Sequence, residues 1–161
     1  MKWENISTTS SSETYQLRHN DKKLLTLTLH PFSNTARVDC EEEKRVFLIR
    51  KEGFRRNKTV LRTEYGIKLG ELGTDEKGNF ISINEDRFYY STRQNEVTEL
   101  VLYKDETGPP LVVCGLDINN GDTSLRFEDK NSLVSHPELL MALSWYMFLP
   151  VAKEAMAEPA L

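Results

Sequence analysis

Hydrophobic and polar residues alternate in short segments along most of this chain. In the segment 24–30, Leu25, Leu27 and Leu29 fall on one face of an extended strand, and threonines lie between them. This period of two predicts a strand with one buried and one exposed face. The segment 45–50 is continuously apolar between Arg45 and Arg50, which is typical of a strand buried on both faces.

Similar segments recur at short intervals and are separated by turn signals. The clearest of these signals is Asn120-Gly121, a pair that favours a tight hairpin turn. No helical period interrupts the series, so the pattern predicts antiparallel pairing in a barrel or a sandwich. The predicted strands cover residues 15–18, 24–30, 36–40, 45–50, 59–63, 67–72, 80–83, 87–92, 97–103, 111–116 and 123–127.

The pattern changes near the C-terminal end of the chain. Ser135 and Glu138 have the spacing of a capping box, and the following segment 139–149 contains only Ser144 as a residue that is not apolar. A surface helix would show a polar stripe, whereas a membrane span would need about 20 apolar residues. The segment therefore predicts a core helix over about 136–157, surrounded by protein on all sides. The fold class expected is mainly β with one C-terminal helix.

The N-terminal residues read differently from the rest. Residues 1–13 include the run Thr8–Ser12 of small hydroxyl side chains, which predicts a flexible N-terminal arm before one β-barrel domain over 14–161. The first residues are too polar for a secretory signal, so a cytoplasmic location is expected. Cys40 and Cys114 match no zinc-ligand spacing and are expected to be buried, reduced thiols, with a disulfide left open.

A β-rich chain that ends in a fully apolar helix resembles the tubby C-terminal-like superfamily, which includes tubby, the phospholipid scramblases and the LURP-one-related proteins. The resemblance lies in the helix segment 139–149 and in the strand-rich stretch 45–72. In that stretch, Val46–Ile49, Val60–Arg62 and Tyr65–Leu69 look like the repeated hairpins of the LURP-one type. Over residues 15–157 the resemblance implies a closed antiparallel β-barrel wrapped around a central hydrophobic helix. It carries over no functional residue.

Motifs for catalysis, metal binding or cofactor binding are missing from the sequence. The three histidines, His19, His30 and His136, lie in no nucleophile motif, and there is no Walker loop or dinucleotide fingerprint. The segment 117–128 has the length of a calcium loop, but Asp122 stands where that loop needs glycine, so a hairpin turn explains it better. The sequence therefore predicts no metal and no cofactor, and it favours a non-enzymatic binding domain over an enzyme.

Charge is distributed unevenly along the chain. The net charge is −4, but residues 44–68 carry nine basic and two acidic residues. One interpretation is a solvated hairpin whose charges pair with acidic neighbours such as Glu41–Glu43. The other is an anion-binding surface at the turn 53–58, because arginine binds phosphate with two parallel hydrogen bonds. The candidate anion-binding residues are Arg50, Lys51, Arg55, Arg56, Lys58 and Arg62.

Two kinds of partner fit such a surface: an anionic membrane contacted peripherally, with Phe54 inserted beside the headgroups, or a phosphorylated ligand. Nucleic acid is disfavoured, because no motif of stacking aromatic residues is present. The alternatives are a small-molecule-binding or catalytic β-barrel, and a structural protein that forms a homodimer through an exposed strand edge. The apolar helix weakens the barrel alternative, because it is expected to fill the interior.

Overall fold

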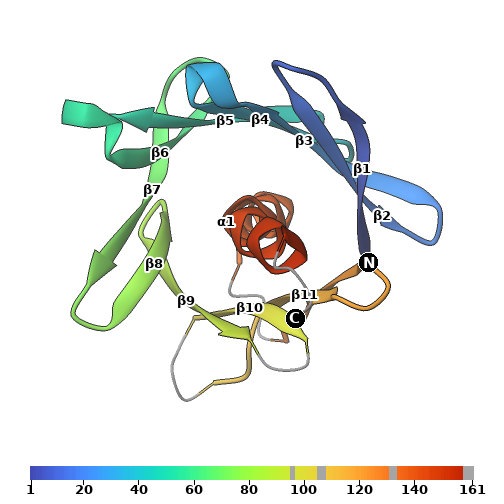
Figure 1. Cartoon of the computed structure of the whole chain (residues 1–161). Coiled ribbons are helices and arrows are strands. Elements are labelled where there is room, and N and C mark those ends of the chain that lie inside the picture. The colour runs from blue at the N-terminus through green and yellow to red at the C-terminus, as the bar shows by residue number, and fades with distance from the viewer. Residues whose placement is uncertain (95–96, 105–107, 131–133, 158–161) are drawn as a thin grey trace.

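The chain forms a nearly closed antiparallel β-barrel around one helix (Figure 1). The computed structural model describes residues 1–94, 97–104, 108–130 and 134–157, without the side chain of Arg56. Each strand pairs with its neighbours in sequence, so the sheet is a simple meander of twelve strands among the described residues. The strands are β1 Lys2–Thr8, β2 Glu13–His19, β3 Lys22–His30, β4 Thr35–Cys40, β5 Arg45–Glu52, β6 Lys58–Thr63, β7 Lys68–Asp75, β8 Gly78–Ile83, β9 Asp86–Gln94, β10 Thr98–Tyr103, β11 Val112–Asp117 and β12 Asp122–Phe127.

The first and last strands meet and close most of the barrel. The Leu125 N–H donates to the Met1 carbonyl oxygen at 2.8 Å. Further along, the Trp3 N–H donates to Thr123 Oγ1 at 3.1 Å, and the Thr123 hydroxyl donates to the Trp3 carbonyl oxygen at 2.6 Å. Because β12 begins at Asp122, the rest of β1 extends past the end of its partner. The seam is therefore closed at one end of the barrel and open at the other.

The N-terminal segment corrects a prediction. Residues 1–13 were expected to be a flexible arm, but β1 occupies Lys2–Thr8 and pairs along its length with β2. The hydroxyl-rich run supplies the turn between these two strands. Trp3 is 3% exposed, so this single large side chain joins the core. One buried indole and a strand partner outweigh the polar composition of the segment, which is why composition alone misled.

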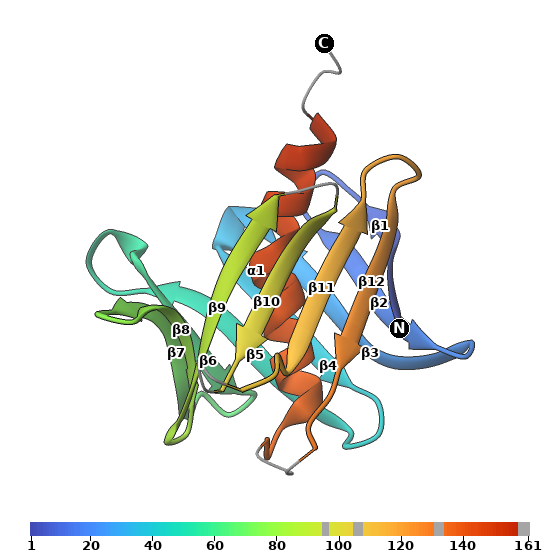
Figure 2. The same cartoon turned by 90° about the horizontal axis from the view of Figure 1, so that it is seen from below.

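The helix α1, Pro137–Ala157, runs through the barrel, and its last turns emerge at one end (Figure 2). Trp145 and Phe148 are almost completely buried, and the polar Ser144 is buried too, with its hydroxyl donating to the Leu140 carbonyl oxygen at 2.8 Å. The expected central helix and its surrounding β shell are thus confirmed. Among the described residues, no helix is both long enough and apolar enough to cross a membrane.

Inward-facing rows of side chains from the strands pack against α1. On β5 the row begins with Phe47 and Ile49, both fully buried, while Val46 and Leu48 on the outer face are only half-buried. The prediction that this strand is buried on both faces was therefore wrong. The helix lies against the inner face of the barrel, so along β5 the inward-facing residues are enclosed and the outward-facing ones are more exposed.

The two cysteines lie in the core, and Cys40 lies beside the first turn of the helix. Cys40 and Cys114 are both buried and unpaired, as expected for reduced thiols. Burial, with the nearby Glu138 carboxyl, raises the pKa of Cys40 to about 12, so its thiol is unreactive at neutral pH. The helix begins at Pro137, one residue later than a cap at Ser135 requires. Glu138 faces Cys40, and burial raises the pKa of its carboxyl.

Candidate functional site

The six predicted anion-binding residues all lie in the hairpin formed by β5, β6 and the connection between them, and a second connection lies beside that one at the same end of the barrel. Short 3-10 helices form there: η1, Pro31–Ser33, joins β3 to β4, and η2, Phe54–Arg56, joins β5 to β6. The Lys51 N–H donates to the Asn34 carbonyl oxygen at 3.2 Å, which places the two connections side by side. This is also the end at which α1 emerges, since Lys51 and the helix residue Lys153 line one cavity.

Each of these connections exposes a phenylalanine. Phe32 in η1 is 80% exposed and Phe54 in η2 is 82% exposed, so neither side chain contributes to the core. The Arg55 guanidinium lies 5.4 Å from the centre of the Phe54 ring, close enough for a cation–π contact. Gly53 has a φ of +86°, a backbone conformation that favours glycine and turns the chain sharply out of β5. The turn therefore presents an aromatic ring and a cation together to solvent.

The six predicted residues do not form one surface. Alternation along β5 and β6 puts Arg50, Lys58 and Arg62 on the outer face of the barrel, whereas Lys51 faces inward. Arg55 lies in η2, and the Arg56 side chain is outside the described residues. The structure thus brings Arg50, Arg55 and Lys58 to the outside of one end and separates Lys51 from them.

Arg62 is held by the fold. Its Nε and Nη2 each donate to the Glu52 carboxylate at 2.8 Å, and its Nη1 donates to the Gly66 carbonyl oxygen at 2.9 Å. The hydrogen bonds from Arg62 lower the pKa of Glu52, so both charges persist at neutral pH. Five N–H donors exist on a guanidinium, and three are used here. Arg62 therefore stabilises the β5–β6 hairpin, and its guanidinium is largely occupied and poorly available to bind a ligand.

Four of the other predicted anion-binding residues lack such partners among the described residues. Glu41 and Glu42, predicted neighbours of the basic segment, bind Lys23 and Lys22 instead, at 3.1 and 3.0 Å. Within the described part of the chain, Arg50, Lys51, Arg55 and Lys58 make no ion pair. The Glu52 carboxylate lies across from Lys58 and near Arg50, but within the described residues it pairs directly with Arg62 alone.

The helix does not fill the barrel mouth, and two cavities flank its C-terminal half. The first, which we call the Lys51 cavity, has a volume of about 470 Å³ and lies between α1 and strands β3, β5, β6, β9 and β10. Leu29, Leu100, Met147 and Val151 provide much of its apolar lining, and Lys51 continues the inward row of β5 to its rim. This volume is within the range of about 300–1,000 Å³ that is typical of small-molecule sites. The expectation that the helix fills the interior therefore fails at this end.

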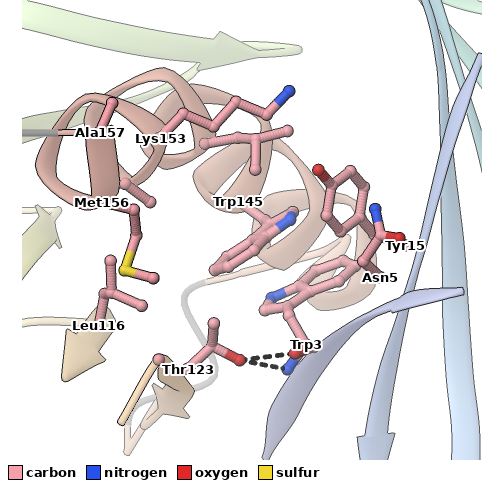
Figure 3. Close-up of a pocket in the computed structure, with 12 residues that line it drawn as sticks. Trp3, Asn5, Tyr15, Leu116, Thr123, Trp145, Lys153, Met156 and Ala157 are labelled. Carbon is pink, nitrogen blue, oxygen red and sulfur yellow. Dashed lines mark hydrogen bonds between the residues drawn. The ribbon is translucent and has the colours of Figure 1, made fainter. Parts of the chain in front are cut away.

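The second cavity, which we call the seam cavity, also has a volume of about 470 Å³ and opens where β1 extends past β12 (Figure 3). Trp3 and Trp145 stack along one side, with ring centroids 5.2 Å apart and planes at 13°. Their Nε1 atoms are buried and have no hydrogen-bond partner in the described structure. Because those donors are shut off from solvent, the wall that they form is effectively apolar.

A polar cluster borders the seam cavity. The Lys153 ammonium donates to both carboxylate oxygens of Glu13, at 2.6 and 2.8 Å, and the Tyr15 hydroxyl donates to the same carboxylate at 3.0 Å. The Lys153 hydrogen bonds lower the pKa of Glu13, and burial raises the pKa of Tyr15 to about 12. In Figure 3 the Lys153 side chain points away from the stacked indoles. Among the described residues that line the seam cavity, the one charged side chain, Lys153, is therefore already paired.

No protein-family model, curated protein or solved structure matches this chain. The cavities themselves were missed by sequence reasoning. A signal for one of them was present: the period of two that buries Phe47 and Ile49 also directs Lys51 inward. A lysine at the end of a buried row indicates a place where the interior reaches solvent.

Proposed function

We propose that this chain is a non-enzymatic binding domain that contacts an anionic membrane surface through the barrel end formed by η1 and η2. The observation that carries this proposal is the exposed turn at Phe54 and Arg55, where an aromatic ring lies beside a cation that has no ion pair among the described residues. Phe32 projects from the adjacent connection. Two exposed apolar rings, one of them beside the Arg55 guanidinium, fit a membrane surface, which has anionic headgroups outside and hydrocarbon beneath them.

The energies expected from these groups are sufficient for reversible binding. Each basic residue near an anionic bilayer contributes about 1 kcal/mol, which applies here to Arg50, Arg55 and Lys58. Moving a phenylalanine ring completely out of water contributes about 1.5–3 kcal/mol. Because the rings protrude from connections and not from the core, their insertion requires no unfolding. Binding should therefore depend on both salt and anionic lipid.

The layout of the chain supports a second part of the proposal, its relationship to other proteins. A meandering barrel around a central hydrophobic C-terminal helix is the arrangement implied by the resemblance to the tubby C-terminal-like superfamily. We propose membership of that superfamily on layout alone. A membrane-contacting domain would be peripheral, in agreement with the expected cytoplasmic location.

Co-sedimentation with vesicles tests the membrane contact. The wild-type chain should bind phosphatidylcholine vesicles that contain phosphatidylserine, and binding should weaken as salt is added. Replacing Arg55→Glu together with Lys58→Glu should abolish binding. The matched control is Lys22→Glu with Lys23→Glu, which makes the same charge change at the opposite end of β3 and should retain binding.

Three outcomes would overturn the membrane proposal. Binding that survives in the Arg55→Glu, Lys58→Glu variant would exclude this surface. Equal binding to pure phosphatidylcholine would exclude charge recognition. Binding of a phosphoserine peptide, without binding to vesicles, would assign the surface to a phosphorylated partner. The predicted homodimer remains a separate prediction, which light scattering can test.

A further inference from the structure

The Lys51 cavity combines an apolar interior with a charged rim. Leu29 from β3, Leu100 from β10, and Met147 and Val151 from α1 line its interior. Tyr90 and Tyr146 also line it, and burial raises the pKa of both, so both side chains are neutral hydroxyls at physiological pH. Such a site buries hydrocarbon well and can receive one polar group at its opening.

The charge at the rim has one sign. Of the described residues that line the cavity, the charged ones are Lys51 and Lys153. No aspartate or glutamate is among them. Lys153 is already neutralised by Glu13, at 2.6 Å. Lys51 makes no ion pair in the described structure, although it lies beside an apolar cavity. The complementary group for this lysine is therefore an anion that arrives with a ligand.

We propose that the Lys51 cavity binds a single-chain anionic amphiphile, with its hydrocarbon chain beside α1 and its anionic head at the Lys51 ammonium. A medium-chain fatty acid is the simplest member of this class. A volume of about 470 Å³ accommodates one such chain and not the two chains of a membrane phospholipid. The head can reach Lys51 without being buried, which avoids the cost of desolvating a carboxylate.

This site is distinct from the proposed membrane contact. The membrane contact uses Arg55, Lys58 and the exposed rings outside the barrel, whereas the amphiphile lies inside the mouth and needs no bilayer. The seam cavity differs as well, because its lysine is occupied and its buried indole donors are closed off. Each site can therefore be removed without removing the other.

Isothermal titration calorimetry with decanoate below its micelle concentration tests the proposal. The wild-type chain should bind one decanoate, and decyltrimethylammonium should bind at least tenfold more weakly. Lys51→Met should weaken decanoate binding about tenfold, because a hydrogen bond to a charged group is lost, and Lys51→Arg should retain most of the affinity. Thr59→Trp, which places an indole inside the cavity, should abolish binding, whereas Thr28→Trp on the outer face of β3 should not.

Several results would overturn the proposal. Equal affinity for decanoate and decyltrimethylammonium would exclude recognition of the anion, and unchanged affinity in Lys51→Met would exclude its stated partner. A crystal structure with decanoate beside Trp3, in the seam cavity, would place the site elsewhere. If Thr59→Trp fails to fold, the Lys51 variants decide the question, since Lys51 is exposed at the rim.

The proposed membrane contact can fail independently of this site. Arg55→Glu with Lys58→Glu should leave decanoate affinity at the wild-type level, whatever its effect on vesicle binding. Loss of decanoate binding in that variant would contradict the assignment of the head group to Lys51.

Discussion

Lys51 and Arg62 show how differently two basic residues of one hairpin can be used. Arg62 lies on the outer face of β6, where Glu52 and the Gly66 carbonyl hold its guanidinium. Lys51 lies on the inner face of β5, at the rim of a largely apolar cavity. Strand alternation assigns the two faces, but the partner at each face is set by strand pairing. One arginine is thereby structural and one lysine is available to a ligand.

The ion pair between Glu13 and Lys153 gives a prediction about pH. Because the hydrogen bonds from Lys153 lower the pKa of Glu13 below its usual 4.5, the folded state favours the ionised carboxylate. The pair therefore stabilises the fold above that usual pKa, and this contribution disappears as the pH falls through the lowered pKa. Glu13→Gln should reduce the free energy of unfolding at pH 7 by less than about 1 kcal/mol, since the Lys153 side chain is 51% exposed.

Urea unfolding of the wild type and Glu13→Gln between pH 7 and pH 3 measures this difference. The two stabilities should converge at the acid end. In a Lys153→Met background the effect of Glu13→Gln at pH 7 should shrink, because the partner is gone. A difference as large at pH 3 as at pH 7 would show that the carboxylate charge is not its source.

At the scale of elements, α1 determines the architecture. A helix that is apolar on every face needs a complete enclosure, and a single flat sheet could cover only one side of it. The twelve described strands provide this enclosure by curling around the helix until β1 meets β12 (Figure 1). The enclosure is incomplete in the C-terminal half of the helix, where the two cavities lie.

Charged substitutions on α1 test its central position. Trp145→Asp or Phe148→Asp should unfold the chain, because each places a carboxylate where the native side chain is at most 2% exposed. Truncating such aromatic side chains already costs about 3–5 kcal/mol, and a buried charge adds to that loss. Met156→Asp on the same helix, at a position 53% exposed, should leave the fold intact. Circular dichroism and thermal melting distinguish these results, and a folded Phe148→Asp variant would remove the helix from the core.

At the scale of the whole molecule, closure of the barrel depends on residues at opposite ends of the chain. Trp3 contributes both its main-chain hydrogen bonds to Thr123 and its ring, which stacks on Trp145. This residue therefore joins β1, β12 and α1. Its ring also forms part of the wall of the seam cavity, and α1 lies between the two cavities, since Leu149 and Lys153 line both.

Trp3→Ala tests this closure. The substitution should lower the free energy of unfolding by about 3–5 kcal/mol, as expected for removing a large buried aromatic side chain. Ile6→Ala on the same strand, at a position 48% exposed, should change stability by about 0.5 kcal/mol or less. Guanidinium unfolding measures both. Similar small effects for the two variants would mean that the N-terminal segment is a flexible arm after all.

The sequence by itself determined the strands, the position of the helix and the enclosure of the helix by a β shell. These properties follow from the spacing of apolar side chains over a few residues, which is a local signal. The same signal failed for β1, because its one buried residue, Trp3, is recognised only through contacts with Thr123 and Trp145. The polar composition of the segment agrees with the exposure of the other β1 residues, but it does not reveal that the strand pairs with β2 and β12.

Only the tertiary structure decided which of the basic residues are free. Charge counting along residues 44–68 treats Arg62 and Lys51 alike, whereas strand register gives one a carboxylate and the other a cavity. The cavity exists because side chains from five strands and α1 leave space at the mouth, and no local pattern encodes that space. Sequence separations as large as the 120 residues between Trp3 and Thr123 explain why: the contacts that shape this end form only when the whole barrel closes.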